Sequence, residues 1–78
     1  MLEIYYSSKF LRMYKKLSPG VKIFAEEQEN IFRTNPHDFR LKTHKLAGKL
    51  KNYWAFSIGR GYRIIFSFIE KIAFISML

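Results

Sequence analysis

The sequence predicts a single small α+β domain in which two helices pack on one face of a mainly antiparallel sheet. Three observations predict it: a β-prone stretch begins the chain, two helical patterns follow, and three alternating stretches joined by tight turns fill the remainder. Helices and strands that occur in separate runs are typical of α+β folds. At 78 residues there is room for one domain, residues 1–78, without repeats or an internal linker.

The first half of the chain is predicted to form a strand and two helices. Residues 2–6 alternate and are β-prone, which indicates the first strand. Ser7 and Ser8 then precede apolar residues at helical spacing, so a serine hydroxyl is expected to cap a short helix with a basic outer face. Ser18 and Pro19 begin a second helix, because serine is a good cap and proline suits the first helical position. The predicted core-facing stripes are Phe10, Leu11, Tyr14 and Leu17 in the first helix and Val21, Phe24, Ala25, Gln28, Ile31 and Phe32 in the second.

The second half is predicted to be a polar loop followed by a three-stranded meander. Residues 37–52 have the polar pattern of a loop. The expected strands and turns are 53–58, a turn at 59–61, 62–69, a turn at 70–71, and 72–78. The last strand is expected to have an open edge, to which a partner segment could add as a further strand.

The composition points to a polyanionic partner. The net charge is +8, and the segment 33–63 carries eight bases and one acid, Asp38, for a segment charge of +7. Such a surface attracts nucleic acid, acidic protein segments or anionic lipid. Because there is no cysteine, disulfide frameworks and thiolate zinc sites are excluded, which fits a reducing cytoplasm. No signal peptide is recognisable, and no apolar stretch approaches the roughly 20 residues of a membrane helix.

Two residues of the basic segment are candidates for chemistry. Positive neighbours favour the neutral form of an imidazole, and a neutral His44 near pH 7 could take a proton from a ribose 2′-hydroxyl; the alternative is an ordinary surface histidine. Arg63 lies among apolar residues, where it either pairs with an acid or points into a phosphate-binding pocket. The six acids are scattered and three of them lie on the second helix, so nuclease chemistry is expected to need no metal.

Aromatic residues near the basic segment could stack on exposed bases. Trp54 and Phe56 are expected to face the core together with Ile58, at the two-residue period of a strand, whereas Tyr53 lies on the opposite face. The predicted RNA-binding residues are Lys42, Lys45, Lys49, Lys51, Tyr53 and Arg60.

Two stretches carry a resemblance to a known family. Residues 44–58 read HKLAGKLKNYWAFSI and residues 61–66 read GYRIIF. With the opening residues 4–17, these motifs resemble the RelE/ParE toxin superfamily over the whole chain, most of all its RelE/StbE and YafQ-like branch. The resemblance implies a cytoplasmic, ribosome-dependent endonuclease that cuts mRNA without a metal or other cofactor. It also implies that an acidic antitoxin blocks the enzyme.

The resemblance also assigns residue roles. His44 matches a catalytic histidine of the YafQ-like branch, Arg63 matches an arginine that contacts phosphate and transition state, and Lys45, Lys49 and Lys51 fall where members keep bases for RNA. Two departures leave another reading open. Ser57 stands where many members have arginine or histidine. Members of the family also normally continue beyond the last strand with a stretch that contains glycine, histidine and often tyrosine, and this sequence has no such stretch after Leu78. The alternatives are a gyrase-targeting ParE-type protein, an inactive antitoxin-binding relative, and a general RNA-binding protein.

Overall fold

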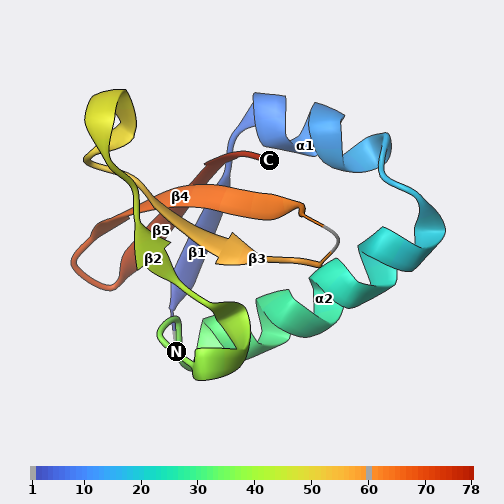
Figure 1. The fold of residues 1–78 in the computed structure, drawn as a ribbon, viewed down its shortest axis with the longest axis horizontal. Helices are drawn as coiled ribbons and strands as arrows, with labels where there is room; N and C mark the ends of the chain where they lie inside the picture. Colours follow the sequence, from blue (N-terminus) through green and yellow to red (C-terminus); the bar gives the residue numbers. More distant parts are fainter. Residues whose placement is uncertain (1, 60) are drawn as a thin grey trace.

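The chain forms a five-stranded mixed sheet with two helices packed against it (Figure 1). This structure, a computed structural model, describes residues 2–59 and 61–78. Its elements are β1 (Glu3–Tyr6), α1 (Ser8–Lys15), α2 (Pro19–Thr34), the 3₁₀ turn η1 (Phe39–Leu41), β2 (His44–Lys45), the 3₁₀ turn η2 (Gly48–Leu50), β3 (Trp54–Ser57), β4 (Arg63–Ile69) and β5 (Ile72–Met77). The predicted α+β fold is confirmed. None of the helices in the described part of the chain is both long and apolar enough to cross a membrane.

The sheet has the strand order β1-β5-β4-β3-β2. The three pairs from β2 to β5 are antiparallel, and β1 pairs with β5 in parallel. The expectation of an open edge on the last strand is therefore wrong, because β5 lies between β1 and β4. The N–H of Ser7 donates to the Ile75 carbonyl at 2.9 Å, which prolongs the contact between the first and last strands. The edges of the sheet are β1 and β2.

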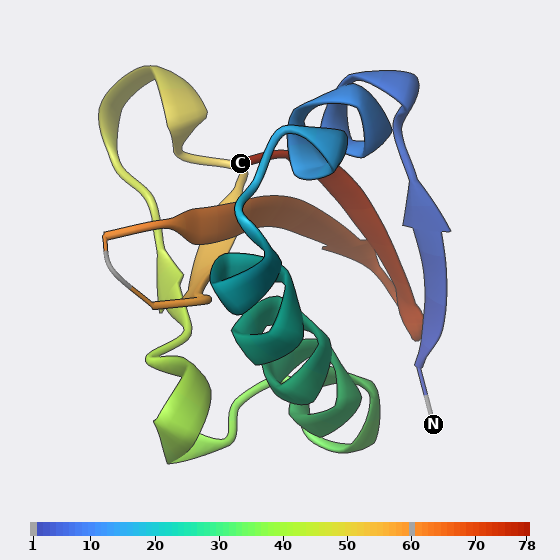
Figure 2. The same ribbon diagram turned by 90° about the vertical axis from the view of Figure 1, so that its right-hand side faces the viewer.

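Both helices begin at the predicted serine caps. The Ser7 hydroxyl accepts from the N–H of Phe10 at 3.0 Å, and the Ser18 hydroxyl accepts from the N–H of Val21 at 3.4 Å. Each bond satisfies a backbone donor that the first helical turn leaves without a partner. Figure 2 shows α2 lying across one face of the sheet.

A single core forms between the helices and this face of the sheet. Phe32 of α2 is fully buried, and its ring centroid lies 4.5 Å from that of Phe56 and 4.8 Å from that of Phe66. Phe56 and Ile58 are buried and Trp54 packs partly buried at the margin, so their predicted inward face is confirmed. The buried core cluster comprises Phe10, Val21, Ala25, Phe32, Leu41, Phe56, Ile58, Ile64, Phe66, Ala73 and Ile75.

Two predicted core residues are exposed. Leu11 is 52% exposed and Phe24 is 42% exposed. Successive helical residues are about 100° apart, so residues next to the buried positions Phe10 and Ala25 turn away from the sheet. A helix that packs through one narrow stripe leaves such neighbours in solvent.

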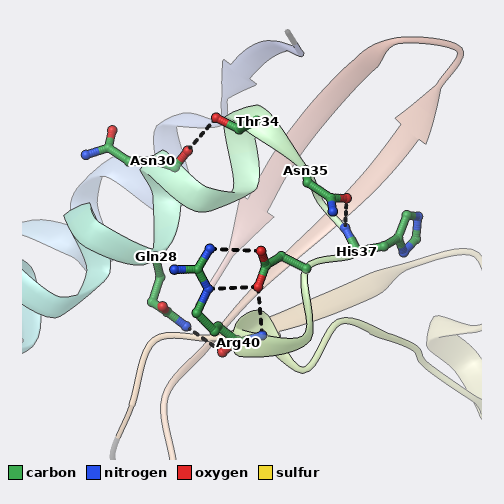
Figure 3. Close-up of polar contacts among 7 residues, drawn as sticks. Gln28, Asn30, Thr34, Asn35, His37 and Arg40 are labelled. Atoms are coloured by element: carbon green, nitrogen blue, oxygen red, sulfur yellow. Dashed lines mark hydrogen bonds and ion pairs between the residues drawn. The ribbon is translucent and has the colours of Figure 1, made fainter.

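The segment 37–52 is more structured than the predicted loop. It contains η1, η2 and the two-residue strand β2, and its Leu41 is fully buried. The buried Gln28 holds this segment in place, since its Nε2 donates to the Arg40 carbonyl at 3.0 Å and to the Ser57 carbonyl at 2.9 Å. Figure 3 shows Gln28 reaching from α2 to Arg40. This bridge fixes η1 against both α2 and β3.

Candidate active site

The strand register places His44 and Arg63 on the same face of the sheet. His44 lies opposite Ala55 and Ala55 lies opposite Ile65, while Arg63, two residues from Ile65 on β4, lies opposite Ser57. Side chains of paired residues share a face, and those two residues apart on one strand also do. From ordinary strand spacings, the Cα atoms of His44 and Arg63 are roughly 12 Å apart.

This face is the one turned away from the core, and we call it the outer face. Phe56 and Ile64 form a register pair that belongs to the core, and their neighbours Ser57 and Arg63 therefore point the other way. Both His44 and Arg63 are exposed. The outer face thus carries an exposed imidazole and an exposed guanidinium, and the register places the buried residues Ala55 and Ile65 between them.

A hydrogen bond fixes the orientation of the His44 ring. Its Nδ1 lies 3.0 Å from the carbonyl oxygen of Lys42. Because a carbonyl only accepts, Nδ1 must carry the proton in this contact. In the neutral ring Nε2 then has the free lone pair, and it is the atom that can take a proton from a ligand. The carbonyl is presented by a left-handed turn at Lys42, with φ 53°.

Arg63 lines a cavity between α1 and the β3–β4 hairpin. The cavity has a volume of about 500 Å³. The described residues that line it are Met13, Lys16, Leu17, Gly61, Tyr62, Arg63 and Leu78, and none of them is acidic. Arg63 makes no ion pair with any other described residue. Of the two interpretations of Arg63 that the sequence allowed, the geometry therefore favours an anion-binding role.

The predicted RNA-binding residues lie in different places. Lys45 pairs with Trp54, so it points to the opposite side of β2 from His44. Lys49 lies in η2 and Lys51 directly follows it, and both are exposed. Tyr53 is partly buried and its carbonyl accepts from the N–H of Leu46 at 2.9 Å. Their contacts with RNA stay predictions.

Two further positions complete the predicted set. Lys42 is exposed and forms the end of η1, next to His44. Arg60 lies outside the described residues. No sequence pattern singles out Lys16, because its position beside Arg63 depends on how α1 packs against the hairpin.

Two bases of the 33–63 segment are already engaged by acids. The Arg40 guanidinium binds both carboxylate oxygens of Asp38 at 2.9 Å (Figure 3), and its hydrogen bonds lower the pKa of Asp38 to about 2. Arg33 pairs with Glu29 at 3.0 Å and donates to the Tyr6 hydroxyl. Burial raises the pKa of Glu29 although Arg33 opposes the shift. The positive charge that this segment can offer to a polyanion is therefore smaller than its total of +7.

No candidate metal site is found within residues 2–59 and 61–78, where no three histidine or acidic side chains come together. The groups that the outer face offers for chemistry are the His44 imidazole and the Arg63 guanidinium. They correspond to a proton acceptor and an anion-stabilising group.

Comparison with solved structures identifies the fold. No protein-family model matches the sequence, and no curated protein matches it either. The structure of YafQ from E. coli strain BL21(DE3) matches with a TM-score of 0.79 and 18% identity, over 99% of this chain and 90% of that chain. A YoeB–YefM toxin–antitoxin complex from Staphylococcus aureus matches with a TM-score of 0.77 and 18% identity, over 99% and 93%. A YoeB/ParE toxin from Agrobacterium tumefaciens matches with a TM-score of 0.78 and 11% identity, over 97% and 94%.

These matches define a class of protein by its architecture. The chain has the fold of the YafQ, YoeB and YoeB/ParE toxins, which is the fold that the resemblance of its motifs implied. Among the structures with this fold, YafQ and YoeB are both matched across nearly the whole of this chain.

Proposed function

We propose that this chain is the toxin of a type II toxin–antitoxin pair and that it cleaves mRNA on the ribosome without a metal ion. The observation that carries the proposal is the register that places His44 and Arg63 on the outer face, with Nδ1 of His44 bound to a carbonyl. The fold shared with YafQ and YoeB supports it.

In the proposed reaction, the nucleophile is a ribose 2′-hydroxyl of the mRNA itself. Nε2 of His44 takes the proton of a ribose 2′-hydroxyl, and the 2′-oxygen forms a bond to the adjacent phosphorus. The bond from phosphorus to the 5′-oxygen breaks, leaving a 2′,3′-cyclic phosphate, and the 5′-oxygen takes up a proton from solvent. Negative charge grows on the non-bridging oxygens in the transition state, where the Arg63 guanidinium would stabilise it.

The proposed regulatory partner is an acidic antitoxin. The net charge of +8 favours binding of an acidic chain. Among the structures with this fold are YoeB in complex with YefM and YafQ in complex with DinJ. An antitoxin that covers His44 or Arg63 would block the proposed site, and it would compete with RNA for the same basic surface.

In vitro translation of a defined message with the purified chain tests the proposal. Primer extension should show discrete cuts that require ribosomes. His44→Gln and Arg63→Ala should each lower the cleavage rate by about 10²-fold or more, because each removes a group that acts in the transition state. Lys71→Ala is the matched control: it removes one positive charge at the β4–β5 turn, at the far end of β4 from Arg63.

The outcome separates the enzyme from its alternatives. Cuts that persist unchanged in both His44→Gln and Arg63→Ala would contradict the roles assigned to these residues. If the wild-type chain makes no cuts, the ribonuclease proposal fails. Inhibition of gyrase supercoiling would then be measured next, because one protein with this fold is described as YoeB/ParE.

A further inference from the structure

The cavity beside Arg63 has features that the proposed cleavage reaction does not use. Lys16 enters it from the end of α1 and Tyr62 enters it from the β3–β4 hairpin. We propose that this cavity is a nucleotide-binding subsite, in which Lys16 binds a phosphate next to the cleaved one and Tyr62 stacks on the attached base. The inference rests on the proposed function, since it assigns the neighbouring part of the same RNA strand.

The lining of the cavity has the two kinds of surface that a nucleotide requires. Lys16 and Arg63 supply positive charge, and among the lining residues that the structure describes there is no acid to neutralise them. Met13, Leu17 and Leu78 supply apolar walls. A volume of about 500 Å³ lies within the ordinary range of small-molecule pockets. A phosphate alone would leave the apolar walls uncovered, whereas a base with its phosphate uses both surfaces.

Tyr62 is held in a position suited to stacking. Its side chain is 45% exposed although it is a large aromatic residue. Its N–H donates to the Gly59 carbonyl at 2.9 Å and its carbonyl accepts from the N–H of Ile58 at 3.1 Å, so a tight turn fixes its backbone. A backbone fixed in advance need not be ordered when a base stacks on the ring, which lowers the entropy cost of binding. Stacking on such a ring accepts any base, which suits a strand of varied sequence.

The backbone of Lys16 is fixed in the same way. Lys16 is the C-cap residue that follows α1, and its N–H donates to the Met13 carbonyl at 3.1 Å. Lys15, the preceding residue, is equally basic, and it lines a second cavity with Lys9, Arg12 and Lys16 but does not line the cavity beside Arg63. The two adjacent lysines therefore form a matched pair: one charge lies in the proposed subsite and the other lies outside it.

The test measures binding of a 2′-O-methyl RNA hexamer, which the chain cannot cleave because the attacking hydroxyl is blocked. Fluorescence anisotropy at several salt concentrations gives the affinity and its salt dependence. Lys16→Ala should weaken binding and lower the slope of log affinity against log salt by about 0.7, the value of one phosphate contact on a single strand. Lys15→Ala should leave the slope unchanged. Tyr62→Ala should weaken binding by about tenfold, and Tyr62→Phe should retain the wild-type affinity.

Specific outcomes overturn the inference. Equal loss of slope in Lys16→Ala and Lys15→Ala would show diffuse attraction to α1 and no subsite. Equal RNA affinity of the wild type and Lys16→Ala would also overturn it. If Lys16→Ala at the same time weakens binding of a hexaglutamate peptide, which represents an acidic protein segment, Lys16 binds acidic protein and not RNA. Circular dichroism of each variant establishes that the fold is retained.

Failure of this inference is distinguishable from failure of the proposed function. If RNA binding depends on Lys16 and Tyr62 but no message is cut on the ribosome, the subsite stands and the ribonuclease proposal fails. If messages are cut and Lys16→Ala and Tyr62→Ala cut them with wild-type kcat/KM, the ribonuclease proposal stands and the subsite fails.

Discussion

Individual bases of the 33–63 segment differ in whether their charge is available to a ligand. Arg40 is bound by both oxygens of Asp38, and Arg33 is bound by Glu29. Lys42 and Lys49 are exposed and make no ion pair with another described residue. A count of charges treats all of these residues alike, although an arginine held by a carboxylate would have to lose that partner before it could bind a phosphate.

The Asp38–Arg40 pair predicts a specific pH dependence of stability. Hydrogen bonds from Arg40 lower the pKa of Asp38 from 3.8 to about 2 in the folded chain. Because the unfolded chain takes up this proton at higher pH, the pair stabilises the fold above pH 3.8 and loses that effect as the pH falls towards about 2. Asp38→Asn should therefore unfold more easily than the wild type at pH 6, and the difference should shrink steadily as the pH falls from 3.8 towards about 2.

Urea unfolding at a series of pH values measures this difference. Glu27→Gln is the control, because it removes an exposed carboxylate that makes no hydrogen bond or ion pair with another described residue. A difference between Asp38→Asn and the wild type that is constant from pH 6 to pH 2 would show that the ion pair does not cause it.

At the candidate site, sequence motifs predict which residues are candidates better than they predict where the side chains of those residues lie in the fold. His44 and Arg63 were predicted from their motifs, and the register places them on one face. Lys45 was grouped with His44, but adjacent residues of a strand point to opposite faces. This separation could not be predicted while the segment was interpreted as a loop. Lys16 could not be found at all, since it reaches Arg63 only through tertiary packing.

At the scale of elements, the β3–β4 turn packs against the first turns of α2. Gly59 has φ +88°, and a Cβ at this position would lie 3.1 Å from the ring of Phe24. Although Phe24 is 42% exposed, one edge of its ring therefore lies against Gly59. Gly20, in the first turn of α2, has no atom within 4 Å of an added Cβ.

The same substitution at these two glycines should have opposite effects on stability. Gly59→Ala should lower the free energy of unfolding by about 1–2 kcal/mol, because alanine is strained at positive φ and its methyl group meets Phe24. Gly20→Ala should raise it by about 0.4–1 kcal/mol, because alanine restricts the unfolded chain without strain in the helix. Thermal or urea unfolding of both variants measures the two effects. A Gly59→Ala variant as stable as Gly20→Ala would show that the turn relaxes to another conformation.

Local signals predicted most elements because they act over a few residues. The serine caps and the alternating strands of the meander are of this kind, and the structure confirms them. The strand β2 was missed because its two residues, His44 and Lys45, are too few to show a period. Leu11 and Phe24 were assigned to the core because apolar character alone does not tell which flank of a stripe meets the sheet.

At the scale of the whole molecule, the sheet joins the two ends of the chain. The parallel pairing of β1 with β5 joins residues such as Ile4 and Ala73, which no local pattern relates. A sequence of three hairpin-connected strands leaves two edges to choose from, and the first strand could have joined either of them. In this fold it covers β5 and leaves β2 at the other edge, next to the basic loop.

The aromatic cluster beneath the sheet should supply a large share of the stability of this small domain. Phe32 is 0% exposed and packs on Phe56, Phe66 and Phe68. Phe32→Ala should lower the free energy of unfolding by about 3–5 kcal/mol, because it removes buried apolar surface and leaves a cavity. Domains of this size have little stability to lose, so the variant is expected to be largely unfolded near its working temperature.

The exposed Phe39 provides the control for this last prediction. It is 86% exposed, so Phe39→Ala should change the free energy of unfolding by no more than about 0.5 kcal/mol. Guanidinium unfolding followed by Trp54 fluorescence measures both variants, since Trp54 packs at the margin of the same cluster against Phe68. Equal losses in Phe32→Ala and Phe39→Ala would contradict the packing described here. A loss confined to Phe32→Ala would show that the helix-to-sheet core stabilises the sheet whose outer face carries His44 and Arg63.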